Sequence, residues 1–230
     1  MKRIDPSHPF AGPPLLPLAV VHVLLFAASL AVNAILRHGQ AYANPYGPIE
    51  DAQRFFTTNP VALRWSAFFL FGSAVPLGIF TATAVARLRF LGVRAAGTYI
   101  TLLGGAATSI AIAVSALCTW VLSVPEVNSS IATLRLVHFS SFLAGGVAFA
   151  VGFGLLAAGI SVTSFFTLLL PRWLVWFGLL IAVAGELSWF SLVAYPMNFT
   201  LPITRFGGFI WLIAVGALLP KNRHDSDSPA

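Results

Sequence analysis

Between Pro14 and Arg37 the chain reads LLPLAVVHVLLFAASLAVNAIL, an apolar run without a single charged side chain. A helix needs about 20 such residues to cross the hydrocarbon core of a bilayer. The core of a signal peptide is only about 7 to 15 residues long, so this run predicts a first membrane span and not a cleaved leader.

The same pattern recurs along the rest of the chain. Charged residues make up 9% of the 230 residues and apolar residues 58%, whereas a soluble domain carries roughly a quarter charged residues. The sequence therefore predicts an all-α, polytopic membrane protein, in which residues 14–220 form one bundle of six transmembrane helices. The expected spans are about 14–37, 62–86, 95–122, 134–160, 172–195 and 204–220.

The basic residues predict the orientation of the bundle. With six spans, the basic connections at 87–94 and at Arg172 fall on the same side as both chain ends. Lysine and arginine accumulate on the cytoplasmic side of a membrane. We therefore expect a cytoplasmic N-terminal segment (1–13), a disordered cytoplasmic tail (221–230) and an extracytoplasmic loop (38–61). The expected location is the inner (plasma) membrane of the cell.

The formal net charge of +6 does not indicate a nucleic-acid partner, because the bases lie beside helix ends and not on one solvated face. The expected partner is the lipid bilayer. The single cysteine, Cys118, excludes an intrachain disulfide and a multi-thiolate metal site. The sequence has no nucleotide-binding loop, zinc-helix or Ser-His-Asp signature, so we expect no catalytic residue, metal ion or cofactor.

Two predicted spans carry a small residue at every fourth position, which makes a smooth face for close approach of another helix. Packing within the bundle is the favoured interpretation. A homo-oligomer or a partner in a larger membrane complex is the alternative. The residues are Gly97, Thr101, Gly105, Ser109 and Ala113 in the third span, and Gly146, Ala150, Gly154 and Ala158 in the fourth.

Glu186 is the most prominent polar residue at membrane depth. It lies well inside the fifth predicted span, and an ionisable group there is a functional candidate because it is costly in a bilayer. Gly178 and Ala182 share its face of the helix, which indicates that another helix packs there. The carboxyl group is a candidate proton carrier, cation ligand or ligand anchor. A neutral acid that only joins two helices is the alternative.

A second polar stripe runs along the outer half of the fourth span and contains His138. On the predicted topology His138 and Glu186 share the outer half of the bundle, so they can meet directly or through water. Arg135 and Arg64, with Arg205 at the same level, would make the mouth of such a site positive. The predicted ligand-binding residues are Glu186, His138, Arg135, Asn33, Arg64 and Ser141.

The first span has its own polar stripe, in which His22 and Ser29 fall on the same helical face as Asn33 and Arg37. This face should turn toward the bundle. Imidazole is also a haem ligand. However, His22 lies toward the cytoplasmic side and His138 toward the other, so their depths disfavour one haem held by both.

Two short motifs carry a resemblance to a known family. One is Asp51-Ala-Gln-Arg-Phe-Phe with the following Leu63-Arg64-Trp65-Ser66. The other is Leu170-Pro171-Arg172-Trp173-Leu174, followed by Gly178-Leu-Leu and Ala184-Gly185. In layout and in these motifs the chain resembles a large bacterial family of six-span integral membrane proteins of unknown activity. The resemblance implies a membrane location and carries no functional residues over.

Taken together, these patterns favour a non-enzymatic protein that binds or helps to transport a small ligand in an outward-opening polar pocket. A structural or accessory subunit of a larger membrane complex is one alternative. A cofactor-dependent membrane oxidoreductase that uses His22 or His138 is the other.

Overall fold

The computed structural model describes residues 10–222, and every regular element within this range is a helix. Six helical segments are long and apolar enough to cross a membrane, so the predicted all-helical, six-span architecture is confirmed and the chain is a multi-pass membrane protein. Most of the predicted tail and the first nine residues lie outside the described range. The spans are Leu15–Leu36, Pro60–Phe90, Gly97–Val121, Ile131–Thr167, Arg172–Leu192 and Tyr195–Leu218.

The first three spans are single helices, and the last three are composite. The single helices are α1 (Leu15–Leu36), α3 (Pro60–Phe90) and α4 (Gly97–Val121). The fourth span joins α6 (Ile131–Leu143), the π-helical turn η1 (Ala144–Ala148) and α7 (Phe149–Thr167). The fifth joins α8 (Arg172–Leu187) to the 3₁₀ turn η2 (Ser188–Leu192). The sixth joins η3 (Tyr195–Phe199), α9 (Thr200–Pro202), the π-helical turn η4 (Ile203–Gly207) and α10 (Gly208–Leu218).

The sixth span differs from its prediction, since it begins at Tyr195 and not near residue 204. Pro196 stands in the first turn, where its missing N–H costs nothing, and Pro202 directly precedes η4. These prolines suggested a turn in the sequence, but the chain remains helical through them. Arg205 is therefore carried from the expected end of the span into its interior.

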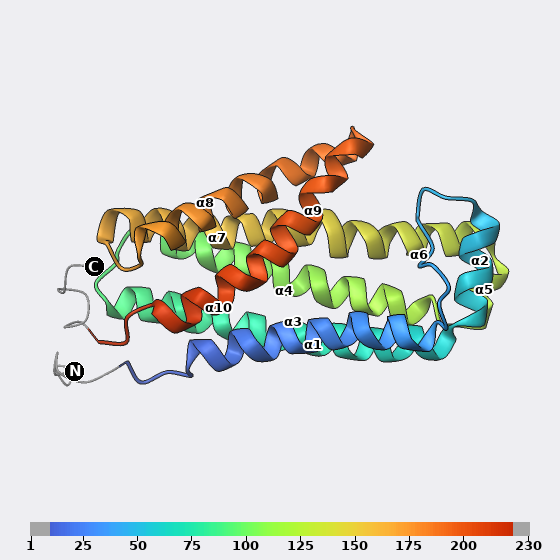
Figure 1. The fold of residues 1–230 in the computed structure, drawn as a ribbon, viewed down its shortest axis with the longest axis horizontal. Coiled ribbons are helices and arrows are strands. Elements are labelled where there is room, and N and C mark those ends of the chain that lie inside the picture. Colours follow the sequence, from blue (N-terminus) through green and yellow to red (C-terminus); the bar gives the residue numbers. More distant parts are fainter. Residues whose placement is uncertain (1–9, 223–230) are drawn as a thin grey trace.

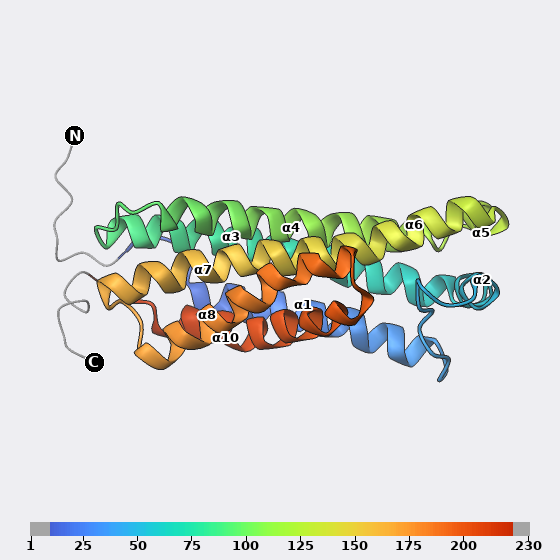
Figure 2. The same cartoon turned by 90° about the horizontal axis from the view of Figure 1, so that it is seen from above.

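The helices pack in a chain of neighbours that closes on itself. The pairs α1 and α3, α3 and α4, α4 and α7, and α7 and α8 lie side by side, and α10 returns to pack on α1. Figure 2 shows α7 running between α4 and α8. The Trp211 side chain of α10 is fully buried, and its indole N–H donates to the Leu174 carbonyl at 3.2 Å. This contact ties the last span to the fifth.

Glycines set the closest helix crossing. Cβ atoms added at Gly104 of α4 or at Gly152 of α7 would lie within 3 Å of backbone atoms of the other helix. The small-residue stripes noted in the sequence are likewise covered inside the chain. Gly105 packs against Thr81 of α3, and Gly154 packs against Gly185 of α8. A partner molecule would therefore have to use other surfaces.

One end of the bundle holds both described ends of the chain and is called the termini end (Figure 1). The Phe10 N–H donates to the Lys221 carbonyl at 3.1 Å. Arg87, buried in the last turn of α3, donates to the Leu219 carbonyl at 3.3 Å. The α3–α4 and α7–α8 connections lie at this same end.

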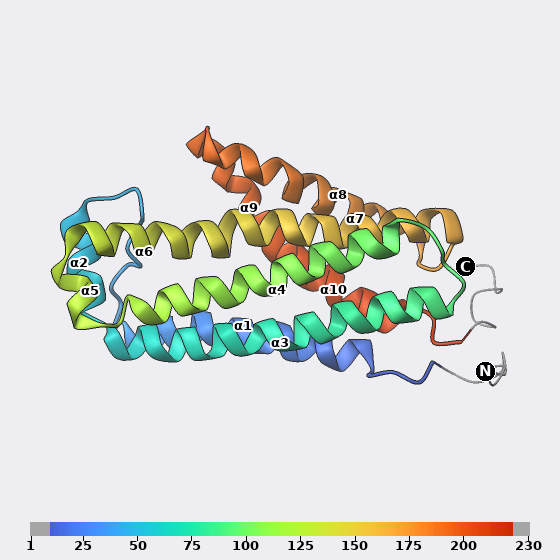
Figure 3. The same ribbon diagram turned by 180° about the vertical axis from the view of Figure 1, so that it is seen from behind.

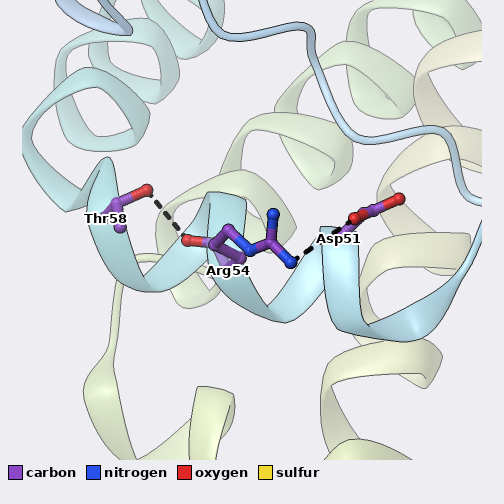
Figure 4. Close-up of polar contacts among 3 residues, drawn as sticks. All are labelled: Asp51, Arg54 and Thr58. Atoms are coloured by element: carbon purple, nitrogen blue, oxygen red, sulfur yellow. Dashed lines mark hydrogen bonds and ion pairs between the residues drawn. The ribbon is translucent and has the colours of Figure 1, made fainter.

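The opposite end, called the loop end, carries the connection 37–48 and the short helices α2 (Ile49–Thr58) and α5 (Pro125–Ser129), as Figure 3 shows. The α2 helix buries Ala52, Phe55 and Phe56. Its other face is solvated: Arg54 pairs with Asp51 at 3.9 Å, and the Thr58 hydroxyl donates to the Arg54 carbonyl (Figure 4). A small second core of buried side chains lies beneath α2 and includes Leu63, Leu122 and Leu134.

The outside of the bundle is apolar along the spans. Leu24, Phe68, Leu103 and Ile110 are each more than 60% exposed, although they lie inside helices. Such a surface fits the hydrocarbon of a bilayer and does not fit water. Exposed tryptophans, which favour the membrane interface, stand near the ends of three spans at Trp65, Trp120 and Trp173.

Candidate ligand-binding cavity

A cavity of about 630 Å³ lies between α1 and the α6–η1 segment, in the part of the bundle that leads from its middle to the loop end. This volume falls within the usual range of small-molecule sites, about 300 to 1,000 Å³. Its walls come from α1, α3, α4, α6 and η1, its floor from α9 and η4, and its cover from the connection 37–48.

Serine and threonine side chains bind the walls to one another. Between α4 and α6, Ser115 donates to the Ser141 carbonyl at 2.9 Å, and the Thr119 and Ser141 hydroxyls lie 3.0 Å apart. Between α1 and α3, Ser29 donates to the Ser66 carbonyl at 2.9 Å. These groups are already paired, so their first effect is to fix the shape of the cavity.

His138 lies on the α6 wall of the cavity, among aromatic side chains from the connection 37–48 and from α2. The His138 ring lies edge-on to Phe56 of α2, with ring centres 4.8 Å apart, and 6.4 Å from the ring of Tyr42. The Ala43 backbone also interacts with this imidazole. The second ring nitrogen, Nε2, is buried and has no hydrogen-bond partner among residues 10–222.

Tyr42 belongs to the connection 37–48, outside the spans. Its ring is partly exposed, but the protein around the phenol raises the pKa of Tyr42 to about 12, because burial disfavours the charged form. The hydroxyl group is therefore neutral at physiological pH and adds no negative charge to the cavity.

Arg205 forms the floor of the cavity and lies near the middle of the sixth span. Its guanidinium carbon lies 5.4 Å from the ring centre of Phe26 and 5.0 Å from that of Phe149. Phe26 stands near the middle of α1, and Phe149 near the middle of the fourth span. The guanidinium also donates to the Gly145 carbonyl. A permanently charged group at this depth is costly, which makes Arg205 the strongest functional candidate.

Two π-helical turns face each other at this point. Gly145 and Gly146 belong to η1, and Arg205 belongs to η4. A π-turn widens a helix and interrupts its regular hydrogen bonds, and such turns are frequent at functional sites. Here one π-turn presents the Gly145 carbonyl and the other presents the guanidinium that binds it.

The charge in the cavity is positive and unbalanced. Arg37 and Arg205 are among its lining residues, and no aspartate or glutamate of the described chain lines it. Within residues 10–222 the one ion pair is that between Arg54 and Asp51, on the solvated face of α2. The Nε atom of Arg205 is buried without a hydrogen-bond partner in the described part of the chain.

The predicted site residues divide into two groups. Asn33, His138, Ser141 and Ser29 line the cavity together. Arg64 and Arg135 do not line it. Arg64 donates to the Ser123 hydroxyl at 3.2 Å, and the Arg135 side chain is exposed.

The structure does not bring Glu186 to His138. Glu186 lies on α8 against Gly154 of α7, outside the cavity, and its buried Oε1 atom has no hydrogen-bond partner within residues 10–222. The expectation that these two side chains meet rested on depth alone. The fifth and sixth spans lean away from the bundle toward their connecting turns (Figure 1), which separates α8 from α6.

His22 also lies outside the cavity. It is fully buried, its Nδ1 atom is 2.8 Å from the Ser73 carbonyl oxygen, and its ring meets Phe209 edge-on. His22 and His138 occupy different regions of the bundle, as their predicted depths implied. No three His, Cys, Asp or Glu side chains of the described range are grouped as metal ligands.

The chain matches no protein-family model, no curated protein and no solved structure at a significant level. The resemblance to a bacterial six-span family therefore stays a prediction. Function has to be inferred from the cavity itself.

Proposed function

We propose that this protein binds a small ligand in the cavity beneath the connection 37–48, as a binding or transport-related membrane protein without an enzymatic reaction of its own. The observation that carries the proposal is a ligand-sized cavity in the loop-end half of the bundle that is lined by Asn33, His138 and Arg205. The half-buried Arg205 side chain lines this cavity and is the charged group that a ligand there would meet.

We further propose that the loop end faces the extracytoplasmic side of a bacterial plasma membrane. Three arginines lie at the termini end: Arg87 and Arg89 in the last turn of α3, and Arg94 in the short connection to α4. Short basic connections stay on the cytoplasmic side. With the termini end in the cytoplasm, the loop end and the cavity near it would face outward.

The test is access of a water-soluble thiol reagent to the cavity. In a Cys118→Ser background, Asn33→Cys places one thiol on the cavity wall, Glu126→Cys places one on the exposed loop end, and Ile110→Cys places one on the apolar exterior of α4. A membrane-impermeant methanethiosulfonate reagent, added to intact cells, should modify Glu126→Cys fastest and Asn33→Cys next. It should leave Ile110→Cys unmodified, because lipid covers that position.

Modification of Asn33→Cys at the rate of Ile110→Cys would mean that the cavity is not hydrated from the loop end, and the proposal would fail. Thermal unfolding of each variant in detergent, compared with the Cys118→Ser parent, shows that the differences in labelling come from access and not from misfolding.

A further inference from the structure

We infer that the ligand is an amphipathic anion: a carboxylate or phosphate head that binds Arg205, joined to an apolar chain. The inference rests on the proposed function and names the class of ligand that the cavity takes. Arg205 and Arg37 supply positive charge, and no acidic side chain of the described residues lines the cavity to neutralise it.

The floor of the cavity is built to hold an oxyanion. The Arg205 guanidinium uses one hydrogen bond on the Gly145 carbonyl and packs between Phe26 and Phe149. Its planar fork has five N–H donors, and the half-buried Arg205 side chain is among the residues that line the cavity. Carboxylates and phosphates match this fork, and such charge-assisted hydrogen bonds are the strong ones.

The remainder of the cavity is too large and too apolar for a head group alone. A water molecule occupies about 30 Å³ of liquid volume, so an inorganic anion of a few water volumes fills a small part of the 630 Å³. Leu30, Leu70, Ile112 and Phe142 line the rest. These side chains offer contact to a hydrocarbon chain, which leaves water favourably when it is buried there.

The position of the wall also suits an amphiphile. Leu30 lines the cavity and is nevertheless 47% exposed. It lies six residues before the end of α1, which places it about 9 Å below that end. An exposed apolar side chain at this depth offers contact to a hydrocarbon chain, in the cavity or in the lipid beside it. A lipid and a soluble amphiphile share this chemistry, so the experiment below separates them.

The experiment measures binding of radiolabelled laurate to the purified full-length chain in dodecyl maltoside, a neutral detergent, by scintillation proximity. Unlabelled dodecyl phosphate should compete about tenfold or more better than 1-dodecanol, which has the same chain and no charge. Inorganic phosphate alone should compete poorly. If 1-dodecanol competes as well as dodecyl phosphate, or if laurate does not bind, the inference is overturned.

A matched pair of variants tests the role of Arg205. Arg205→Gln should weaken laurate binding about tenfold or more, since it removes a charged hydrogen-bonding group from the cavity. Arg135→Gln removes an equal charge from an exposed side chain outside the cavity and should change binding less than about twofold. Equal losses in the two variants would show a general charge effect and overturn the assignment.

Arg205→Gln also removes the hydrogen bond to the Gly145 carbonyl. If this loss prevents the variant from folding, a second variant is needed to test the charge of the cavity. Arg37→Gln serves, because the Arg37 side chain lines the cavity and has no side-chain hydrogen bond or ion pair among the described residues. It should fold normally and weaken laurate binding about threefold or more. Unchanged affinity in a folded Arg37→Gln variant would count against the anion site.

Competition by a phospholipid identifies the source of the anion, and the thiol-labelling result separates the ligand class from the proposed function. Dihexanoyl phosphatidylglycerol competing better than dodecyl phosphate would identify a lipid as the source of the anion, and the reverse would identify a soluble amphiphile; both support the inference. Hydration of the cavity at Asn33→Cys without preference for anionic competitors would sink the ligand class and leave the proposed function standing. A cavity closed to the thiol reagent would sink both.

Discussion

Gly152 determines how closely α4 and α7 approach at the centre of the bundle. A Cβ atom added there would lie 2.7 Å from the Thr108 hydroxyl and 2.9 Å from the Thr108 backbone nitrogen. The second of these atoms cannot move without displacing the helix. The bundle therefore depends on a missing side chain as much as on those that are present.

Gly152→Ala should destabilise the protein by about 1 to 3 kcal/mol, the usual range for overpacking a tight contact. Gly72→Ala is the matched control, because the nearest atom to its added Cβ is a Leu25 methyl carbon at 3.8 Å. That change should be neutral or slightly stabilising, since alanine favours a helix more than glycine does. Thermal unfolding followed by fluorescence-detected size exclusion compares the two, and equal melting temperatures would contradict the packing argument.

Individual residues also show how far sequence reasoning reaches. Helical periodicity predicted that the stripe of Ser29 and Asn33 in α1 turns toward the bundle, and in the structure these residues line the cavity with His138 and Ser141 of α6. Arg205 was placed at the mouth, although it lies at mid-depth. Its depth depends on where the sixth helix begins, and prolines in the sequence obscured that boundary.

The α4 and α6 helices form the most hydrogen-bonded wall of the cavity. Ser141 joins them through Ser115 and Thr119. Its neighbour Ser140 instead donates to the Leu136 carbonyl of its own helix. The two adjacent serines therefore differ: Ser141 makes hydrogen bonds between helices, and Ser140 makes one within its own helix.

Ser141→Ala should destabilise the protein by about 0.6 to 2 kcal/mol, the range found for hydrogen bonds between membrane helices. Ser140→Ala should leave stability within the error of the measurement. Urea or mixed-micelle unfolding of both variants provides the comparison. A larger loss for Ser140→Ala than for Ser141→Ala would show that the wall is not held together as described.

The α2 helix covers the loop end through its aromatic face. Phe56 is completely buried and meets the His138 ring. The ion pair on the opposite face joins two side chains that are 72% and 63% exposed, and such surface pairs contribute between about 0 and 1 kcal/mol. The α2 helix is therefore held on the bundle by its apolar face.

Phe56→Ala should cost about 3 to 5 kcal/mol of packing energy at the loop end and should speed amide hydrogen exchange in α2. Asp51→Ala should change neither the exchange rate nor the melting temperature appreciably. Hydrogen exchange with mass spectrometry, followed on the peptides that cover α2, compares the two variants. If Asp51→Ala loosened α2 as much as Phe56→Ala, the ion pair would hold α2 in place as strongly as the apolar face does, which would contradict this prediction.

The π-turns η1 and η4 mark the limit of prediction for helical elements. The sequence shows Gly145-Gly146 and a proline three residues before Arg205, and both features occur often in ordinary membrane helices. Only the contact between the Gly145 carbonyl and Arg205 shows that the two turns work together. Such a contact joins parts of the chain 60 residues apart, and no local pattern encodes it.

The complete bundle was predictable in span number and helical class because both follow from the length and apolarity of the segments. Adjacency of the spans was not predictable. Glu186 and His138 were both predicted in the outer half of the bundle, but a series of hydrophobic segments does not specify which helices are neighbours. The separation of α8 from α6 comes from the tilt of the last two spans, visible in Figure 1.

The orientation proposed for the bundle has a direct test in a bacterial host. Green fluorescent protein fused after Lys221 should fluoresce, because it folds in the cytoplasm. Alkaline phosphatase inserted after Asn44, in the connection 37–48, should be active, because it requires the extracytoplasmic side. The Phe10–Lys221 hydrogen bond already joins the two ends of the described chain at one end of the bundle. The opposite pair of signals would reverse the orientation and turn the cavity inward.

The depth of Arg205 has an electrical consequence. Moving one elementary charge across an entire membrane is worth about 2.3 kcal/mol for each 100 mV of potential. An anion that moves from the loop end to the guanidinium beside Phe26 crosses roughly half of the membrane potential. Its binding free energy would therefore change by about 1 kcal/mol per 100 mV. With the loop end outside, the interior-negative voltage of a respiring cell opposes entry, and a depolarised cell fills the cavity more readily.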